Sequence, residues 1–528
     1  MNKYIKAILP VTALALTMGM TSCTNDLDVT PIDPNLDLQF EPEGLLNKCY
    51  ANFAMQGNQG GNEVDIDGFD GGTVGLVRQM WNSNELTSDE AICGWGDEGI
   101  SNFCYNTYDA SHPMLRGFYY RLYTGISFCN QYLQEFGSYN TAMTAEIRFV
   151  RALNYFYLMD GWGNVPFVTS ISSEKPVQYS RQEVYNFVES ELLDIEPLLN
   201  AATAKKSTDA GYGRVDKAAA WLLLARLYLN AEVYTGTAQW QKAADYAKKV
   251  MDSSYKLNTT AVGKWSAYQM LFMGDNGETS AAYEAVFPIL QDGVRTTSWG
   301  TSLFMIASTH DADMSDVNGT TEAWGGNRTR PQLIQKFFPG NDAPEAAPSD
   351  VVKAAGDDRA IFDTRGRELE NTDPSNFKNG YAVAKYNNYT TNGAATSSAQ
   401  FPDADFFLMR SAEAYLTYAE ALARLNGGAT TAEAASAINT LRLRANADTK
   451  ANYSLDEICD EWCREFYFEG RRRMDLVRFG KFGGSSDYVW QWKGGAINGR
   501  NFDATKNLFA IPTTDLTANP NLIQNPGY

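Results

Sequence analysis

Apolar residues recur at helical spacing over much of the chain, and this pattern predicts the elements of the fold. Residues 146–160 place Ile147, Val150 and Leu153 on one side of a helix, and the Gly- and Pro-containing segment 161–166 ends it. Further helices are predicted over residues 43–53, 114–136 and 181–199.

Four predicted helices form two consecutive pairs. Residues 217–234 are followed by 240–251, and residues 411–425 by 431–445. The spacing of Ala, Leu and Tyr within each pair is typical of tetratricopeptide repeats. One pair cannot bury its own apolar face, so we expect a mostly α protein in which stacked pairs, clearest at about 143–252 and 404–446, form one curved scaffold.

Long irregular insertions interrupt the helices. They are rich in Gly, Asn, Asp and Thr and cover residues 57–82, 293–330 and 340–400. Trp299 and Trp324 lie in the second of them, and Trp95 lies in the Gly-rich stretch 94–99. None of the three belongs to an apolar helical face. Since loops this long usually carry function, we expect the ligand site to lie on them.

The first residues have the composition of a secretory signal. Residues 1–22 contain two lysines, an apolar stretch too short to span a bilayer and then small residues before Cys23. Thr21-Ser22-Cys23 resembles a bacterial lipobox, which predicts lipidation of Cys23, a tether over 23–40 and one domain over 41–528. The alternative is an ordinary signal with an incidental cysteine. No later stretch is apolar over about 18 residues, so lipid is the expected membrane attachment.

Charge and motif content narrow the possible functions. The chain has 44 Lys and Arg against 63 Asp and Glu, a net charge of −19. This balance argues against a nucleic-acid partner, because clustered cations drive binding to phosphate backbones. The histidines, His112 and His310, have no nucleophile arrangement beside them, and no hydrolase, metalloprotease or nucleotide-binding motif is present. We therefore expect neither an enzyme nor a cofactor.

For three other groups of residues we favour a structural role over a functional one. Scattered cysteines without CxxC spacing or nearby histidine favour buried thiols over zinc. The acidic residues of segment 275–278 could offer oxygen ligands to calcium, but the segment lacks EF-hand spacing and a solvated turn is favoured. The arginines of 469–478 alternate with Glu469 and Asp475, which favours structural ion pairs over a polyanion site.

The aromatic content, with 11 Trp, 29 Tyr and 27 Phe, admits a sugar-binding surface. The C–H faces of a pyranose are apolar, so a sugar ring stacks on an exposed indole for about 2 kcal/mol. Two or three such rings leave an affinity of roughly micromolar to millimolar after the costs of association. Core packing is the competing interpretation for any single tryptophan.

Several segments together resemble the SusD/RagB family. They are residues 23–34, 146–153, 460–473, 511–512 and 524–528, so the likeness runs from Cys23 to the last residue. Segments 216–236, 460–480 and 492–496 are similar to starch-binding members of that family. The resemblance implies a surface lipoprotein of the outer membrane, with a tetratricopeptide scaffold, that passes oligosaccharides to a TonB-dependent transporter of the SusC type.

The resemblance also implies a set of site residues. Asp70 and Arg78 fall where starch-binding members hydrogen-bond glucose hydroxyls, and Trp95 and Trp324 fall at stacking positions. Trp299 stands where those members have a tyrosine, which keeps a stacking face. A curved arc of three rings favours a helical α-glucan over a flat β-linked chain.

Two positions depart from the family pattern. Cys93 replaces an aromatic residue, and Glu98 takes the place of a hydrogen-bonding asparagine; an ionised carboxylate accepts but cannot donate. The resulting expectation is non-catalytic binding of starch and malto-oligosaccharides at the cell surface. Two alternatives stay open: the same role for a different glycan, and a protein-binding scaffold whose only partner is the transporter.

Overall fold

The structure, a computed structural model, describes residues 41–58 and 60–528. The chain divides into two units, Met1–Leu45 and Leu46–Tyr528. The predicted signal peptide, the lipidation site Cys23 and the tether fall outside the described residues. Among those that are described, no helix has the length and apolar character needed to cross a bilayer.

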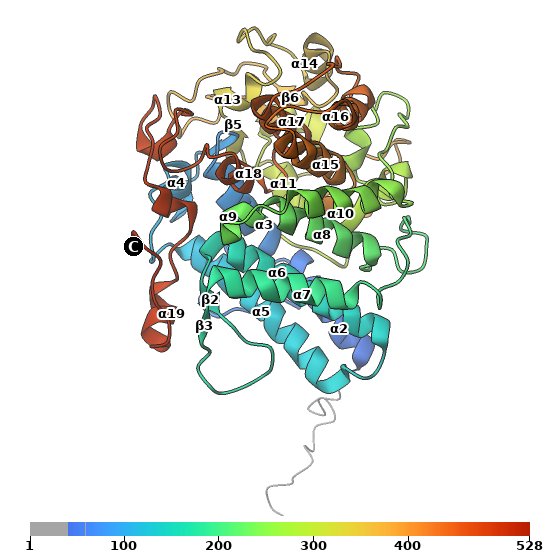
Figure 1. Cartoon of the computed structure of the whole chain (residues 1–528). Coiled ribbons are helices and arrows are strands. Elements are labelled where there is room, and N and C mark those ends of the chain that lie inside the picture. The colour runs from blue at the N-terminus through green and yellow to red at the C-terminus, as the bar shows by residue number, and fades with distance from the viewer. Residues whose placement is uncertain (1–40, 59) are drawn as a thin grey trace, which may run out of the picture. The chain divides into compact units, whose positions relative to one another are not determined.

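Helices dominate the described chain (Figure 1). The longer ones are α2 (Pro42–Ala54), α5 (Pro113–Phe136), α6 (Thr141–Trp162), α7 (Arg181–Ile195), α8 (Lys217–Leu229), α10 (Trp240–Asp252), α15 (Ala412–Leu425), α16 (Ala432–Arg444) and α17 (Leu455–Phe466). The shorter ones are α3 (Leu76–Trp81), α4 (Ile100–Cys104), α9 (Ala231–Thr235), α11 (Ser302–Ala307), α12 (Ser315–Asn318), α13 (Pro331–Ile334), α14 (Pro348–Ala355), α18 (Arg472–Arg478) and α19 (Thr513–Ala518).

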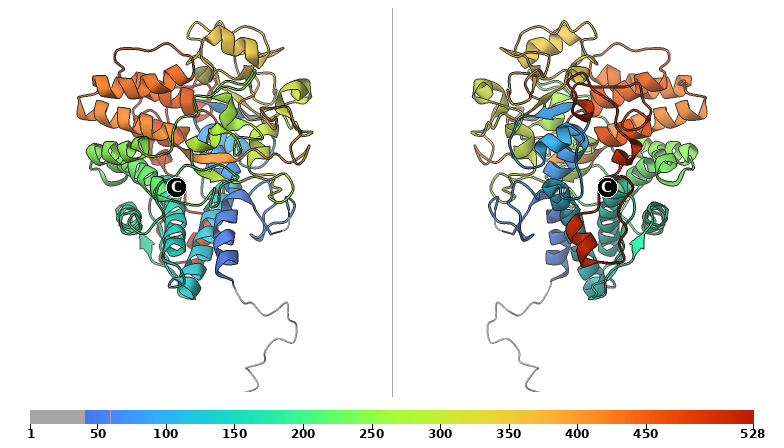
Figure 2. Two further views of the ribbon diagram at one scale, coloured as in Figure 1. Left: turned by 90° about the vertical axis from the view of Figure 1, so that its right-hand side faces the viewer. Right: turned by 90° about the vertical axis from the view of Figure 1, so that its left-hand side faces the viewer.

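The long helices pack in succession. Helix α5 packs on α6 and α6 on α7; α8 packs on α10, α10 on α15, and α15 on both α16 and α17. Figures 1 and 2 show these antiparallel pairs stacked from the cyan α5 and α6, through the green α8 and α10, to the orange helices near the end of the chain. The prediction of a mostly α protein built from tetratricopeptide-like pairs is confirmed.

Local sequence signals start several of these helices. At α7 the Ser180 side chain accepts a hydrogen bond from the Glu183 backbone N–H, and the Glu183 carboxylate accepts one from the Ser180 backbone. Ser454 and Glu457 form the same reciprocal box at α17. Such boxes satisfy N–H groups that the first turn leaves without helical partners, which explains why α7 begins at its predicted start. They also fix the start of α17, a helix that was not among those predicted.

One predicted helix is divided in the structure. The sequence pattern indicates a single helix over 217–234, but α8 ends at Leu229 and α9 begins at Ala231. Asn230, between them, donates from Nδ2 to the carbonyl of Arg226 at 2.9 Å and accepts at Oδ1 from Arg478 Nη1 at 3.0 Å. A side-chain amide that bonds the preceding turn and a distant arginine ends the helix, a competition that periodicity does not reveal.

The predicted irregular insertions contain short buried helices. Helix α3 lies in 57–82, and every one of its residues is buried. Helix α11 lies in 293–330 and is equally buried. Both helices are only six residues long, so their apolar residues do not repeat often enough to stand out among the surrounding glycines. The prediction that these regions hold no helix was wrong.

Strands occur in the described residues only as four antiparallel pairs. They are β1 (Ala91–Cys93) with β5 (Asn327–Thr329), β2 (Val165–Pro166) with β3 (Gln178–Tyr179), β4 (Ala285–Ile289) with β8 (Phe406–Arg410), and β6 (Phe362–Asp363) with β7 (Ala382–Val383). Cys93 lies opposite Asn327 in the first pair. This register brings the loop that follows β1 beside the loop that precedes β5, and these loops carry Trp95 and Trp324.

A buried group of ionic side chains, here called the ionic core, joins β8 to α16 and α17. Its members are Arg359, Arg410, Arg444, Glu284, Glu461, Glu465 and Glu469, none more than 8% exposed. Arg410 donates to Glu284 at 2.9 Å, to Glu465 at 2.6 Å and to Glu469 at 2.8 Å. Burial raises the pKa of Glu465, but Arg444, Arg410 and Arg359 outweigh it and lower this pKa to about 2.

The arginines of segment 471–478 are also paired inside the protein, as predicted. Arg472 donates to Asp89 at 2.7 Å, Arg473 lies 3.1 Å from Asp160, and Arg478 donates to Glu420 at 2.8 Å. The cysteines of the described chain are likewise free and buried, which confirms that interpretation. They are Cys49, Cys93, Cys104, Cys129, Cys459 and Cys463.

Candidate functional site

An open cleft of about 380 Å³ lies where the insertions 57–82 and 293–330 meet the Gly-rich stretch 94–99. Its lining consists of Gly72, Arg78, Trp95, Asp97, Trp299 and Trp324. Arg78 comes from α3, Trp95 and Asp97 follow β1, and the other two tryptophans flank α11 in sequence. All three tryptophans predicted from the sequence therefore face one hollow, although about 200 residues separate the first of them from the others.

The three indoles form a bent row with Trp324 in the middle. The centroid of its ring lies 6.4 Å from that of Trp95 at an interplanar angle of 55°, and 6.1 Å from that of Trp299 at 47°. Each ring is partly exposed rather than buried in the core. The competing interpretation, in which these tryptophans pack in the core, does not apply to them.

Each indole N–H is bound to the protein. Trp95 Nε1 donates to the carbonyl of Gly325 at 3.2 Å, and Trp299 Nε1 to Asn62 Oδ1 at 2.9 Å. Trp324 Nε1 donates to Glu322 Oε2 at 2.8 Å. With these donors used, the rings are held in orientation and offer a ligand their faces rather than a hydrogen bond.

Two glycines make room for the rings. A Cβ on Gly326 would lie 2.2 Å from the Trp95 ring, and a Cβ on Gly61 would lie 2.7 Å from Trp299 Nε1. Real Cβ atoms do not approach so closely, so any side chain at these positions would displace the indoles. The glycine content of the insertions thus serves a packing need at this site.

Hydrogen bonds to neighbouring segments also hold the backbones of the Trp95 and Trp324 loops in place. The Trp324 N–H donates to the carbonyl of Ala307 at 2.7 Å, and the Gly325 N–H to that of His310 at 2.8 Å. On the other side, His112 Nε2 bonds the carbonyl of Gly99, and His112 Nδ1 accepts from the Leu115 N–H. Burial lowers the pKa of His112 and of His310 to about 4, so both imidazoles are neutral at neutral pH.

Arg78 is a buried cation without a carboxylate partner. It is 9% exposed, and among the described residues no acid lies within ion-pair distance of it. Its guanidinium carbon stands 5.4 Å from the ring centroid of Trp95 and 5.2 Å from that of Phe304, and its Nε has no hydrogen-bond partner. Burial lowers the pKa of Arg78, while the negative charge of Asp97 opposes that effect. The Arg78 side chain therefore lines the cleft without a neutralising carboxylate among the described residues.

The predicted acidic residues differ in their placement. Asp70 is exposed, and its Oδ1 and Arg78 Nη1 both approach within 3.3 Å of the point where a Cβ on Gly72 would stand. Glu98 is exposed and does not belong to the lining, whereas its neighbour Asp97 does. Sequence reasoning missed Asp97, although both acids stand in the stretch 94–99, because backbone direction in a glycine loop cannot be deduced from composition.

Cys93, where family members have an aromatic residue, is turned away from the cleft. It is 5% exposed, and its backbone N–H lies 3.4 Å from Cys104 Sγ. Burial raises the pKa of its thiol well above the usual range. The residue therefore contributes to packing beneath the site and presents no stacking face.

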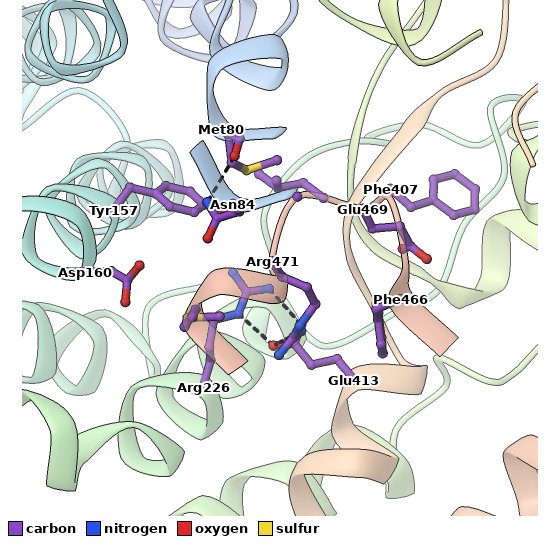
Figure 3. A pocket seen from close by; sticks show the side chains of 13 residues that line it. Met80, Asn84, Tyr157, Asp160, Arg226, Phe407, Glu413, Phe466, Glu469 and Arg471 are labelled. Atoms are coloured by element: carbon purple, nitrogen blue, oxygen red, sulfur yellow. Dashed lines mark hydrogen bonds and ion pairs between the residues drawn. The ribbon is translucent and has the colours of Figure 1, made fainter. Parts of the chain in front are cut away.

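A second hollow lies inside the protein and is enclosed by ionic residues. Figure 3 shows Arg226 and Arg471 meeting Glu413, whose oxygens accept from Arg226 at 2.6 and 2.7 Å. Arg471 Nη1 lies 3.2 Å from Glu413 Oε1. The hollow measures about 30 Å³, which is room for about two water molecules. Because its charged groups are paired with one another or with other residues of the protein, we interpret it as a structural cavity rather than a ligand site.

No metal site accompanies the cleft. Within residues 41–58 and 60–528 no group of three or more His, Cys, Asp or Glu side chains is placed to hold an ion. In the segment considered for calcium, Asp275 Oδ2 accepts from the N–H and the hydroxyl of Thr391 at 2.8 and 2.6 Å. This carboxylate fixes one loop to another.

Comparison with known proteins defines the family. The model of the SusD family matches residues 290–528, and a model described as "Starch-binding associating with outer membrane" matches residues 27–229. The chain is 40% identical to the starch-binding protein SusD of Bacteroides thetaiotaomicron and 25% identical to the SusD-like protein P2 of Formosa agariphila, with complete coverage of both chains in each case.

Solved structures agree on the fold. A laminarin-binding SusD-like protein superposes with a TM-score of 0.66 at 21% identity, over 92% of this chain and 99% of the other. All the residues that line the cleft lie within the two matched segments. On the full-length identity and the family model together, the chain belongs to the SusD family.

Proposed function

We propose that the protein binds α-glucans, the chains of starch and malto-oligosaccharides, in the cleft of Trp95, Trp324 and Trp299. The observation that carries the proposal is the bent row of partly exposed indoles, inclined by 55° and 47° to one another. A β-1,4-linked glucan is nearly flat and would stack on coplanar rings. An α-1,4-linked chain coils, so its successive sugars face different directions and suit rings inclined in this way.

Hydroxyl recognition falls to the charged residues, because the indole N–H groups are used. Within the lining, Arg78 offers guanidinium donors and Asp97 offers acceptors. Asp70 and Glu98 are exposed acids outside the lining, which the family resemblance adds to the proposed site. Hydrogen bonds to charged groups contribute about 1.5–3 kcal/mol each. Stacking adds about 2 kcal/mol per ring, and after association costs the expected affinity is roughly micromolar to millimolar.

The proposal is binding without catalysis. Glycoside hydrolysis uses two carboxyl groups that flank the scissile bond. The described lining of the cleft contains a single carboxylate, Asp97, beside one guanidinium. Neither histidine of the chain lines the cleft, since both are buried beneath its loops. A lining with one carboxylate supports a site that holds a neutral sugar rather than one that cleaves it.

The cellular setting follows from the family. We infer a lipoprotein attached to the outer membrane through lipidated Cys23, facing the cell exterior and delivering glycan to a SusC-like TonB-dependent transporter. The match to a model described as associating with the outer membrane and the 40% identity to a starch-binding protein support this inference. It includes a cleaved signal at 1–22, a tether at 23–40 and a single domain over 41–528.

Native affinity electrophoresis tests the ligand. Gels containing starch, pullulan, dextran, levan, xylan or laminarin are compared with a gel that contains no glycan. We expect retardation by starch and pullulan only. Retardation by a β-glucan alone would assign the same role to a different glycan. Retardation by none of them, together with co-purification of the transporter, would support the scaffold alternative.

Calorimetry with maltoheptaose tests the residues. Trp95→Ala and Trp324→Ala are each expected to weaken binding by about 1–3 kcal/mol while the protein stays folded. Trp265→Ala is the matched control, because Trp265 is another partly exposed indole but does not line the cleft. Unchanged affinity in the first two variants would remove these residues from the site.

A further inference from the structure

The loop that carries Trp324 is connected to all three indoles. Trp324 belongs to it, and Trp95 donates its N–H to the carbonyl of Gly325, the next residue. Trp299 is reached through a second loop, since its ring lies 5.0 Å from that of Phe401 at an angle of 56°. The orientation of the Trp324 ring and the position of the Phe401 ring therefore set the angle between the indoles.

One carboxylate bridges these two loops. Glu322 Oε2 accepts from Trp324 Nε1 at 2.8 Å, and Glu322 Oε1 accepts from Gln400 Nε2, also at 2.8 Å. Gln400 immediately precedes Phe401. Two oxygens of one side chain thus orient the central indole and hold the residue next to the ring that packs on Trp299.

The backbone around Glu322 is itself well supported. Its carbonyl accepts from Asn318 Nδ2 at 3.0 Å and from the Thr320 hydroxyl at 3.0 Å. The Thr321 N–H donates to the carbonyl of Ala399 at 2.8 Å, beside the side-chain bridge. Loss of the carboxylate would therefore release the rings while these bonds keep the two loops in place.

We propose that Glu322, together with Gln400, is a positioning residue that sets the curvature of the tryptophan row and thereby its selectivity for curved α-glucans. Glu322 does not line the cleft, so it acts through Trp324 and Trp299 rather than on the sugar. The inference rests on the proposed function of the cleft. Held at fixed angles, the rings need no ordering when the ligand arrives, and a rigid curved ligand gains most from that preorganisation.

Glu322→Ala tests the bridge by calorimetry with two ligands, flexible maltoheptaose and rigid α-cyclodextrin. We expect maltoheptaose to bind about tenfold more weakly, the scale of one lost hydrogen-bond contribution. α-Cyclodextrin should lose a further factor of about three, because it cannot adapt to displaced rings. The changed ratio of the two affinities is a readout that general destabilisation would not produce.

Glu322→Gln supplies the rescue. Its amide oxygen accepts from Trp324 Nε1, and rotation of the Gln400 amide lets the second bond re-form. Binding of both ligands within about threefold of the wild type is expected. An equal loss in the Gln and Ala variants would mean that the negative charge itself contacts sugar, which overturns the positioning role.

Glu196→Ala is the matched control. Glu196 Oε1 accepts from Trp221 Nε1 at 2.7 Å on the helical scaffold, so the variant loses the same kind of carboxylate–indole bond away from the cleft. Its affinities should equal those of the wild type. If Glu322→Ala fails to fold, Gln400→Ala removes the same bridge from its other end and should alter the same ratio.

Two negative outcomes have different meanings. A wild-type protein that binds neither ligand overturns the proposed function, and this inference with it. A wild-type protein that binds both, with Glu322→Ala or Gln400→Ala unchanged in affinity and in the ratio of the two ligands, overturns only the positioning role of Glu322.

Discussion

Arg410 in the ionic core and Arg78 in the cleft are both buried arginines, but they differ in whether carboxylates surround the guanidinium. Arg410 is fully buried and its guanidinium donates to three carboxylates, those of Glu284, Glu465 and Glu469. Arg78 is 9% exposed, rests against Trp95 and has an unpartnered Nε. Arg410 is neutralised by carboxylates inside the protein, whereas Arg78 has no acid within ion-pair distance among the described residues and is, on the proposed function, available to donate to a ligand.

A substitution in the ionic core should cause the largest change, a loss of stability. Arg410→Met leaves three buried carboxylates without their shared cation, and breaking a buried pair costs about 3–5 kcal/mol. Urea unfolding should report this loss, with maltoheptaose affinity retained in the folded fraction. Arg295→Met, at a side chain that is 86% exposed, is the control and should unfold like the wild type. Equal stability of the Arg410 variant would show that the core can relax around the missing charge.

Lowering the pH should reduce the stability of the protein through His112, which lies beneath the loops of the cleft. Its pKa is about 4 in the folded protein and about 6.5 when unfolded, so the unfolded chain takes up the proton first as pH falls. The stability that neutral His112 contributes is present above pH 6.5 and lost between about 6.5 and 4. Relative to His112→Asn, the free energy of unfolding of the wild type should fall by up to about 3 kcal/mol over that window.

The same series of buffers tests the cleft. No histidine, lysine or cysteine lines it among the described residues, so maltoheptaose affinity should stay flat between about pH 6.5 and 8. A bell-shaped dependence accompanied by product release would contradict the binding assignment and favour an enzyme. If the free energy of unfolding of the wild type and of His112→Asn changed with pH in parallel, the contribution to stability assigned to neutral His112 would be contradicted.

Arg78→Met is the counterpart of the core variant. Methionine keeps apolar contact with Trp95 and Phe304 but removes the donors, so glucan binding should weaken by about 1.5–3 kcal/mol. The free energy of unfolding, measured in urea, should be unchanged or slightly higher, since no ion pair is broken. A marked loss of stability with intact affinity would place Arg78 in the same class as Arg410.

The smallest expected effect distinguishes two neighbouring acids. Asp97→Ala should weaken maltoheptaose binding by about 1 kcal/mol, because Asp97 lines the cleft beside Arg78. Glu98→Ala should change it by less than about 0.5 kcal/mol, as expected for an exposed side chain outside the lining. The reverse order would support the role that the family resemblance implies for Glu98 rather than the role that the cleft geometry indicates for Asp97.

The chain's local patterns determined much of the fold. Apolar periodicity located the paired helices. The capping boxes of Ser180 and Ser454 are local features of the same kind, although the helix that follows Ser454 was not predicted. Glycine-rich stretches correctly identified the loops that carry the three tryptophans. These features depend on residues a few positions apart, which is the range over which helix spacing and capping act.

Only the tertiary structure decided the contacts between distant segments. Asn230 ends α8 partly because Arg478 reaches it, and α3 and α11 are buried helices within glycine-rich insertions. The bond from Glu322 to Gln400, 78 positions along the chain, follows from how the loops pack. By itself the sequence indicated the three tryptophans that we propose stack on sugar. The angles between their rings, and the place of Asp97 in the cleft lining, arose from the packing of segments that periodicity cannot relate.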